Sequence, residues 1–432
     1  MTETATFECV VVGTGPAGLA AALALAAVGV EVAVVGPPPA IHQHAPPASR
    51  EPTFDVSTPE APASVGDTRT AALFAGSIEL LRNLGAWEAV APLSAPLRAI
   101  RIIDDTGGLL RAPELLFEAR EIGLDAFGYN IPNPVLRASL HDAMARRNAV
   151  HVVEAAAVTS VAIADRQATL RTAEGTQLAA RLIVAADGRQ SICRSAAGIG
   201  TRSWSYEQCA IATSFAHGRP HDGVSTEFHG RAGPCTAVPL PRLASSLVWV
   251  ERPATARRLA EMPVAHFRAA LEARLHGLLG PLGEIGPRRL FPLSALTADR
   301  FARNRVALVG EAGHVLPPLG AQGLNLSLRD AAALAECVAT ARRRGDDVGG
   351  PDTLARHHEA RYLDVASRRL AVDALNRTLL ADLLPVQLLR GAGLHLVRAF
   401  SPLKRALIHQ GLQPPGPLPL LMRPGGGGLL AL

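Results

Sequence analysis

The sequence predicts an α/β protein in which a Rossmann-like parallel sheet is interleaved with a second, mixed sheet. Three apolar strand patterns lead to this prediction, at residues 9–12, 182–186 and 306–309. Each pattern ends in a turn that is rich in glycine or contains Asp-Gly. Buried parallel strands form nearly continuous apolar runs, and the strands of one such sheet can lie far apart along the chain.

The first pattern predicts a nucleotide-binding turn. A strand at 9–12 is followed by a GxGxxG turn at 13–18, an Ala/Leu-rich helix to about residue 28 and a second strand at 31–35. This order is the dinucleotide fingerprint, which places a pyrophosphate at the helix N-terminus. The candidate cofactor contacts are Gly13, Gly15, Pro16, Ala17 and Gly18.

One part of the fingerprint is absent. An acidic residue about 20 positions further on usually binds a ribose hydroxyl at the end of the second strand. Gly36 stands at that place, whereas Glu31 lies at the start of the strand and is expected to point elsewhere. We therefore expect adenosine binding to be weaker or to use another residue. Taken alone, the GxGxxG sequence is also compatible with an ordinary tight turn.

The second pattern is a strand at 182–186 that runs into Asp187-Gly188. An Asp-Gly turn at the end of a strand is common, so this pattern alone is weak. In the third pattern, a strand at 306–309 enters a Gly/Pro-rich loop that begins Gly310-Glu311, and a helix opens at Gly323-Leu324-Asn325. Such a loop lets backbone N–H groups approach a ligand, and the helix start adds partial positive charge.

Composition predicts a cytoplasmic enzyme of two to four domains. Lys+Arg 43 against Asp+Glu 38 gives a net charge of +5, but the sole lysine is Lys404 and no basic–aromatic block predicts nucleic-acid binding. The five cysteines show no CxxC pair or metal spacing, so we expect no metal site and buried free thiols. Residues 9–30 are uncharged, but the acidic residues before them exclude a signal peptide.

The remaining segments complete the expected architecture. Residues 37–66 predict a long surface loop, and 67–87 predict a helix. Short strands are expected at 150–185 and 206–250, followed by a helix at about 263–279. Of the histidines, His314 is expected to pack or hydrogen-bond within its loop, and the His357-His358 pair is expected to be exposed.

The C-terminal region is basic and apolar. No acidic residue follows Asp382, and leucines recur at helical spacing between 388 and 408. A basic amphipathic helix of this kind can lie on an anionic membrane, or it can pack against the body or a second subunit. Both possibilities remain open from the sequence. Residues 413–432 are rich in Pro and Gly and are expected to be flexible.

Together these motifs resemble the ubiquinone-biosynthesis hydroxylases, a family of FAD-dependent aromatic monooxygenases in the para-hydroxybenzoate hydroxylase superfamily. The resemblance is carried by residues 67–73, 129–133, 320–326 and 383–391, and it covers nearly the whole chain apart from 37–66. It implies a glutathione-reductase-type FAD-binding domain, a mixed-sheet substrate domain and C-terminal helices. The FAD-binding domain is expected to be discontinuous and to comprise residues 1–95, 136–204 and 288–345. The substrate domain is expected at 96–135 and 205–287, and the C-terminal helical region with its flexible tail at 346–432.

The resemblance also implies the chemistry. NAD(P)H would reduce FAD, O2 would add to form a flavin C4a-hydroperoxide, and the ring of a polyprenyl-phenol-type precursor would be hydroxylated. The cofactor carries this chemistry, so no acid–base residue is assigned. Pro317, Pro318 and Leu319 are expected on the flavin and substrate face. Implied FAD contacts beyond the first turn are Arg69, Arg137, Asp187, Gly188, Gly310, Glu311, Gly323, Leu324 and Asn325.

The chain departs from the family's motifs at one position, and two other functions remain as alternatives to a hydroxylase. The family's second FAD motif commonly begins Gly-Asp, whereas this chain has Gly310-Glu311. A flavin-dependent reductase of a prenyl substrate would share the FAD motifs, and a non-catalytic scaffold of a quinone-biosynthesis complex would tolerate weakened FAD binding. The implied partners of a hydroxylase are the prenylated substrate, such a complex and the inner face of the membrane.

Overall fold

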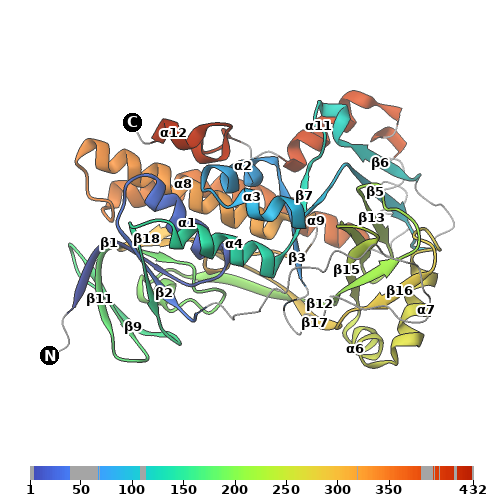
Figure 1. The fold of residues 1–432 in the computed structure, drawn as a ribbon, viewed down its shortest axis with the longest axis horizontal. Coiled ribbons are helices and arrows are strands. Elements are labelled where there is room, and N and C mark those ends of the chain that lie inside the picture. Colours follow the sequence, from blue (N-terminus) through green and yellow to red (C-terminus); the bar gives the residue numbers. More distant parts are fainter. Residues whose placement is uncertain are drawn as a thin grey trace.

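The computed structural model describes residues 4–38, 67, 69–107, 113–318, 320–380, 393, 395–397, 399–412 and 416–430. Two large sheets lie toward opposite ends of the molecule, and the long helices α8 (Gln322–Arg344) and α9 (Pro351–Leu380) run along one side of it (Figure 1). This arrangement confirms the predicted α/β class.

The first sheet is the predicted Rossmann-like core. Strands β19, β11, β1, β2 and β8 are neighbours in this order and are all parallel. The short β18 adds an antiparallel edge, and β9 and β10 extend from β11. The bounds are β1 (Ala5–Val12), β2 (Val32–Gly36), β8 (Val150–Glu154), β9 (Val158–Ile163), β10 (Ala168–Thr172), β11 (Gln177–Ala185), β18 (Ala302–Arg303) and β19 (Val306–Leu308).

Alternation along β1 divides the core of this sheet into two layers. Cys9 and Val11 face α8 and the apolar helix α1 (Pro16–Ala27), against which α4 (Asn133–Ala145) also packs. Val10 and Val12 face β10 and α5 (Ile192–Ala196) on the other side. Because both faces are covered, the apolar run at 9–12 carries no polar residue.

The second sheet is the predicted mixed sheet. Its strand order is β20-β17-β12-β15-β14-β13-β5-β6, with β16 also paired to β12. Helices α6 (Pro253–Glu261) and α7 (Val264–Arg274) cover one face through a cluster that includes Trp249 and Phe267. The bounds are β5 (Ala99–Asp104), β6 (Leu115–Glu118), β12 (Thr201–His217), β13 (Val224–His229), β14 (Pro234–Leu240), β15 (Ala244–Glu251), β16 (Leu282–Ile285), β17 (Arg289–Ala298) and β20 (His314–Val315).

Strand β17 belongs to this second sheet, although the sequence assigned 288–345 to the FAD-binding domain. It pairs with β12 from Thr201 to Ala212, so the two long strands lead from one sheet toward the other (Figure 1).

The prediction of one helix over 67–87 is wrong. Residues 70–74 form β3 (Thr70–Phe74), which pairs with β7 (Gly128–Pro132) in a small sheet that also contains β4 (Ala95–Pro96). The helices α2 (Ala75–Asn83) and α3 (Trp87–Val90) follow. Local apolar spacing suited a helix, but pairing with β7, more than fifty residues away, makes the first part a strand.

The C-terminal segment differs from the expected flexible tail. Within the described residues 416–430, η4 (Leu420–Met422) and α12 (Gly426–Leu430) are formed, and Leu421 and Met422 are fully buried. The Asn83 amide donates to the carbonyls of Leu421 and Arg423, both at 2.9 Å. The burial of Leu421 and Met422 against α2 and α8 stabilises this segment and offsets the destabilising effect of its high Pro and Gly content.

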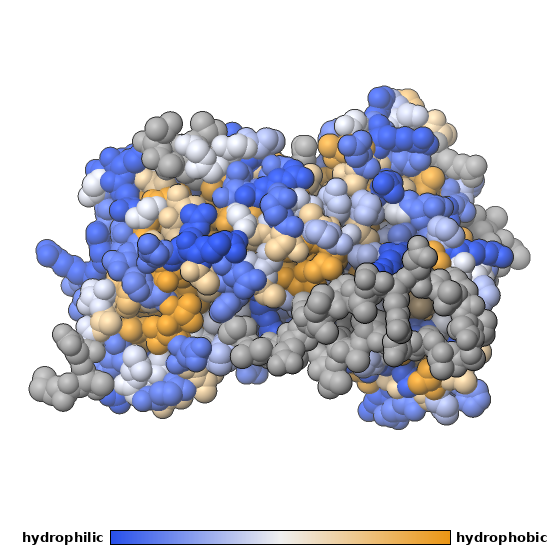
Figure 2. Space-filling model, in the orientation of Figure 1, coloured by the Kyte–Doolittle hydropathy of each residue, from blue (hydrophilic) through white to orange (hydrophobic). Residues whose placement is uncertain are grey.

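Helix α11 (Ser401–Leu412) lies beside β6 and carries both apolar and charged residues; Figure 2 shows the two kinds of surface close together in this region. Its Ile408 is buried in a small cluster with Phe127 and Ala119. Among the helices of the described residues, none is both long enough and apolar enough to cross a lipid bilayer.

Candidate active site

The three sequence patterns converge at one edge of the first sheet. Strands β1, β11 and β19 are parallel neighbours, so their carboxyl ends meet there. The Ala186 N–H donates to Val12 at 2.9 Å, and the Val309 N–H donates to Ala185 at 2.9 Å. A Cβ on Gly13 would lie 2.2 Å from the Ala186 carbonyl oxygen, so the two turns touch and only glycine fits.

The start of α1 forms an open cradle. Gly15 is the N-cap residue and has no side-chain cap, and Pro16 occupies the first turn. Among the described residues, a Cβ on Gly15 would meet no atom within 4 Å, whereas one on Gly18 would lie 2.0 Å from the Gly13 carbonyl oxygen. The space beside the start of α1 at Gly15 is therefore open, as a pyrophosphate site at a helix N-terminus requires. Ala17 lies beside Gly310, where a Cβ would be 3.2 Å from the Ala17 Cβ.

The missing acidic residue at Gly36 has a structural explanation. A Cβ on Gly36 would lie 3.0 Å from the Thr14 side chain, and the Thr14 hydroxyl donates to the Pro37 carbonyl at 2.8 Å. Thr14 thus fills the space beside the end of β2. Glu31 is exposed and pairs with His151 at 3.0 Å, away from the turn, as we expected.

The Asp-Gly turn lies beside this cradle. One Asp187 carboxylate oxygen accepts from the Cys193 N–H at 3.2 Å, and the other is buried and has no hydrogen-bond partner among the described residues. Gly188 has φ +80° and open space around it. A buried carboxylate oxygen that lacks a donor is consistent with a site for a hydroxyl-bearing ligand.

Sequence reasoning missed Arg194, which joins two of the motifs. Its buried guanidinium donates to the Ala312 and Arg189 carbonyls, each at 2.8 Å. It therefore holds the Asp-Gly turn against the Gly-Glu loop. No local sequence pattern indicates this role, because Ala312 lies 118 residues further along the chain.

Glu311 is held by an arginine of the Asp-Gly turn. Its carboxylate pairs with the Arg189 Nε at 3.0 Å, and Arg189 also donates to the Ser294 hydroxyl at 3.0 Å. Both charged side chains are about half exposed, at 50% and 54%. An ion pair between the two turns thus accommodates Glu311, whose side chain is longer than that of the aspartate common in the family's motif.

Arg69 lies near the same loop. It forms two bonds to the Asp67 carboxylate, at 2.7 and 2.8 Å, and its guanidinium lies 5.4 Å from the centre of the Phe291 ring. The hydrogen bond with Asp67 raises the pKa of Arg69, and Glu311 contributes to the same shift. Arg137 lies half-buried in the first turns of α4, the helix that packs on α1.

The Asn325 side chain fixes the start of α8. Its carbonyl oxygen accepts from the Phe74 N–H at 2.9 Å and the Ser77 hydroxyl at 2.8 Å. Its amide donates to the Ala72 and Ala321 carbonyls, at 2.8 and 2.7 Å. Because the side chain is fully used within the protein, only its backbone remains for a cofactor. Gly323 is exposed, and Leu324 is partly buried beside it.

The expected flavin and substrate face is described in part. Pro317 is buried and Pro318 is exposed, while Leu319 lies outside the described residues. Gly320 and Ala321 both have positive φ, at +63° and +53°, so the loop turns sharply into α8.

A buried ionic network lies behind this loop. His314 bonds Asp330 at 2.7 Å, and Asp330 also accepts from the Gly310 N–H and from Arg361. Burial alone would raise the pKa of Asp330, but His314 and Arg361 lower it below its ordinary value. His314 is buried, as a packing role predicts, but its hydrogen-bond partner lies on α8 and not within the loop.

The expectation that His357 is exposed is wrong. It is fully buried and bonds the Leu308 carbonyl at 3.2 Å, and burial lowers its pKa to about 4. His357 lies on the side of α9 that packs against β19, which explains this burial, whereas the neighbouring His358 is partly exposed.

Four of the five cysteines are buried and free, and Cys337 is partly buried. Burial raises the pKa of the Cys337 thiol to about 12, and it also raises that of Cys193. Within the described part of the chain, no group of three or more His, Cys, Asp or Glu side chains could hold a metal ion.

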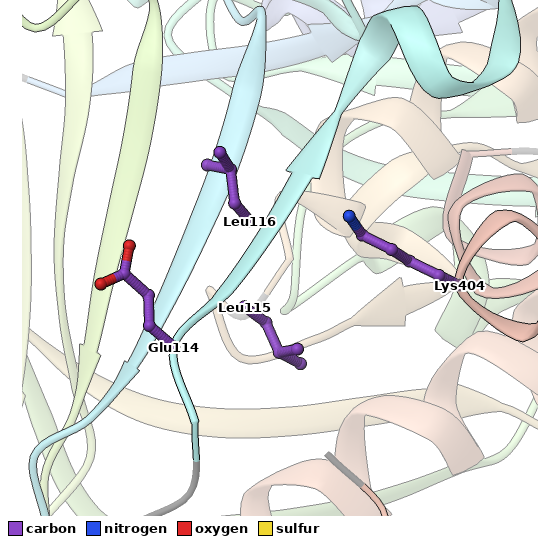
Figure 3. Close-up of a pocket in the computed structure, with 4 residues that line it drawn as sticks. All are labelled: Glu114, Leu115, Leu116 and Lys404. Carbon is purple, nitrogen blue, oxygen red and sulfur yellow. The ribbon is translucent and has the colours of Figure 1, made fainter. Parts of the chain in front are cut away.

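A separate pocket of about 370 Å³ lies between β6 and α11, where Glu114, Leu115, Leu116 and Lys404 line it (Figure 3). Lys404 pairs with Glu121 at 2.7 Å, and Glu114 pairs with Arg101 at 3.0 Å. Both of its charged side chains already have partners, so we place the chemistry at the converging turns.

The open cradle at α1, the Asp-Gly and Gly-Glu turns beside it and the second sheet define an FAD-binding flavoprotein. A family model described as "FAD binding domain" matches residues 60–364. The chain is 34% identical to ubiquinone hydroxylase UbiL of Rhodospirillum rubrum over 94% of its length and 89% of that protein. It is 30% identical to 3-demethoxyubiquinol 3-hydroxylase of Escherichia coli, over 94% of the chain and 98% of that protein.

A solved structure has the same fold. The p-nitrophenol 4-monooxygenase PnpA of Pseudomonas putida superimposes with a TM-score of 0.73 at 18% identity, over 96% of this chain and 100% of PnpA. The chain therefore belongs to the FAD-dependent monooxygenases of the ubiquinone-biosynthesis family, and it is an FAD-dependent hydroxylase.

Proposed function

We propose that the protein uses NAD(P)H and O2 to hydroxylate the aromatic ring of a polyprenyl-phenol-type ubiquinone precursor. The observation that carries the proposal is the convergence of three FAD motifs at one sheet edge, beside a second sheet large enough to cover a ring-shaped substrate. Relatives that match most of the chain and bear the name of ubiquinone hydroxylases support the choice of substrate.

The proposed FAD contacts follow from this convergence. The first turn, through Gly13, Gly15, Pro16, Ala17 and Gly18, would receive the pyrophosphate. Asp187, Gly188, Gly310 and Glu311 would line the middle of the cofactor, together with Arg69 and Arg137. The backbone at Gly323, Leu324 and Asn325 would lie near the flavin, where the start of α8 favours negative charge.

When bound, FAD would supply the redox chemistry by taking a hydride from NAD(P)H and passing an oxygen atom from O2 to the ring. The protein's own part is positioning and exclusion of water. Pro317 and Pro318, with Leu319, would form the face toward the substrate. None of them exchanges protons, and the buried His314 is already bonded to Asp330.

The location and partners of the enzyme also form part of the proposal. We place it in the cytoplasm, with α11 against the inner face of the membrane and within a quinone-biosynthesis complex. Helix α11 exposes Arg405 and Leu407, which suits an anionic lipid surface, while its Lys404 pairs with Glu121. The domain limits given in the sequence analysis stay part of the proposal, with β17 assigned to the second sheet.

The test is incubation of the purified protein with FAD, NAD(P)H, 18O2 and a prenylated phenol, followed by mass analysis of the product. One 18O atom in the ring would support the proposal. Reduction of the prenyl group without 18O would indicate a reductase, and no product despite bound FAD would favour a scaffold. A phenol that lacks the prenyl chain is the matched control for the role of the tail.

A further inference from the structure

Glu311 presents an electrostatic difficulty in an FAD site. The cofactor carries two phosphate charges, and an unpaired carboxylate close to them would oppose binding. Glu311 directly follows Gly310, and Gly310 contacts Ala17 in the first turn of α1. The carboxylate therefore belongs to the loop that lies against the pyrophosphate cradle.

Among the described residues, Arg189 forms an ion pair with this carboxylate, and Arg69 lies near enough for Glu311 to raise its pKa. The Arg189 Nε lies 3.0 Å from the Glu311 Oε2, and a second nitrogen of Arg189 donates to Ser294. The backbone of Arg189 is fixed as well, since its carbonyl accepts from Arg194 at 2.8 Å. Arg189 also follows Gly188 directly, so the pair joins the two turns that flank the cradle.

We propose that Arg189 is a positioning residue for FAD: its guanidinium pairs with Glu311 and neutralises a carboxylate that would otherwise repel the anionic cofactor. This inference rests on the proposed FAD site. It assigns Arg189 a role that works through Glu311, whereas a direct phosphate contact would act independently of that residue.

The expected effect is moderate because the pair is half exposed. Solvent screening limits the repulsion between a freed Glu311 and the phosphates, so removal of Arg189 should raise the Kd for FAD by about three- to tenfold. The change should shrink as salt is raised from about 0.05 M to 0.5 M, since mobile ions screen exposed charges.

The experiment is titration of FAD into the full-length, deflavinated protein, with flavin fluorescence as the readout. Four variants are compared with the wild type: Arg189→Ala, Arg189→Lys, Glu311→Gln and the double variant Arg189→Ala/Glu311→Gln. We expect Arg189→Ala to weaken binding in a salt-dependent way. Arg189→Lys should stay within about threefold of the wild type, because it keeps the charge. With Glu311→Gln as the reference, the further change Arg189→Ala should alter the Kd for FAD by less than about threefold, because no carboxylate remains to be freed.

Two outcomes would overturn the inference. Arg189→Ala could bind FAD like the wild type, or Arg189→Ala could weaken FAD binding as much in the Glu311→Gln background as it does in the wild type. Thermal unfolding of each apoprotein checks that the variants fold, and a folding defect in Arg189→Ala that the double variant does not rescue counts against the inference. Wild-type protein that binds no FAD at all would instead contradict the proposed function.

Discussion

Asn325 joins three separate segments through one side chain. Its four hydrogen bonds link the start of α8 to the backbone of β3, to Ser77 of α2 and to Ala321 of its own loop. The sequence identified Asn325 through the FAD motif and predicted that its backbone faces the flavin. It could not predict the side-chain role, because the partners at Ala72, Phe74 and Ser77 lie about 250 residues earlier.

Asn325→Ala should destabilise the protein by about 3 kcal/mol or more, since it leaves several buried donors and acceptors unpaired. Chemical unfolding of the apoprotein measures the change. Thr159→Ala is the control, because its exposed side chain donates to the carbonyls of Arg171 and Thr172, at 3.1 and 3.5 Å, and its loss should cost less than about 1 kcal/mol. Equal losses in the two variants would contradict this account of Asn325.

Alanine substitutions at Gly15 and Gly18, which lie in the same turn, distinguish an effect on cofactor binding from an effect on folding. Gly15→Ala should fold normally, because its Cβ meets no protein atom and its φ of −74° suits alanine, but the methyl group would enter the cofactor's space. We expect FAD binding at least about tenfold weaker, with the apoprotein's Tm unchanged to within about 2 °C.

Gly18→Ala is the matched comparison, because its Cβ would collide with the Gly13 carbonyl and should lower both Tm and FAD affinity. FAD titration and thermal unfolding check the two variants side by side. Unchanged FAD affinity in Gly15→Ala would show that the cofactor does not occupy the start of α1.

Among the elements, those that depend on local patterning were predicted from the sequence. The strands β1, β11 and β19 contain continuous apolar runs, and the helices α1 and α8 begin at glycine-containing turns, so the local sequence encodes these strands and helix starts. Elements that depend on distant partners were not predicted. β3 needs β7 for its hydrogen bonds, and η4 needs the apolar surface of α2 and α8.

The C-terminal segment is an example of this dependence, and it should stabilise the FAD-binding half. Leu421 is fully buried in the main core cluster, so Leu421→Ala should cost about 2–5 kcal/mol. Leu407→Ala on the exposed side of α11 is the control and should change stability by less than about 0.5 kcal/mol. Urea unfolding measures both variants; a Leu421→Ala protein as stable as the control would mean that the segment does not pack as described.

At the scale of the whole molecule, buried ionisable groups make stability depend on pH. His357 is held neutral with a pKa of about 4, while the unfolded chain has the ordinary value of about 6.5. Between these values the unfolded chain binds a proton that the folded protein does not, so stability falls on acidification, by on the order of 3 kcal/mol at pH 4. The lowered pKa of Asp330 acts in the same direction below about pH 4.

We therefore expect the urea midpoint to fall steadily from about pH 7 to pH 4. His357→Gln should make the fall between about pH 6.5 and 4.5 shallower, because this imidazole no longer titrates; the lowered pKa values of His217 and His358 leave part of the slope. A wild-type midpoint that does not change over this range, or an unchanged slope in His357→Gln, would contradict the assignment.

The central claim is that the three converging turns form a working FAD site in an oxygen-using hydroxylase. Its most direct test is the visible spectrum of the FAD-loaded protein with its substrate, before and after anaerobic addition of NAD(P)H and then after O2. We predict flavin bands that bleach with NAD(P)H and return with O2. A protein that takes up no FAD even when the cofactor is in excess, or whose bound flavin NAD(P)H does not reduce, would contradict the claim.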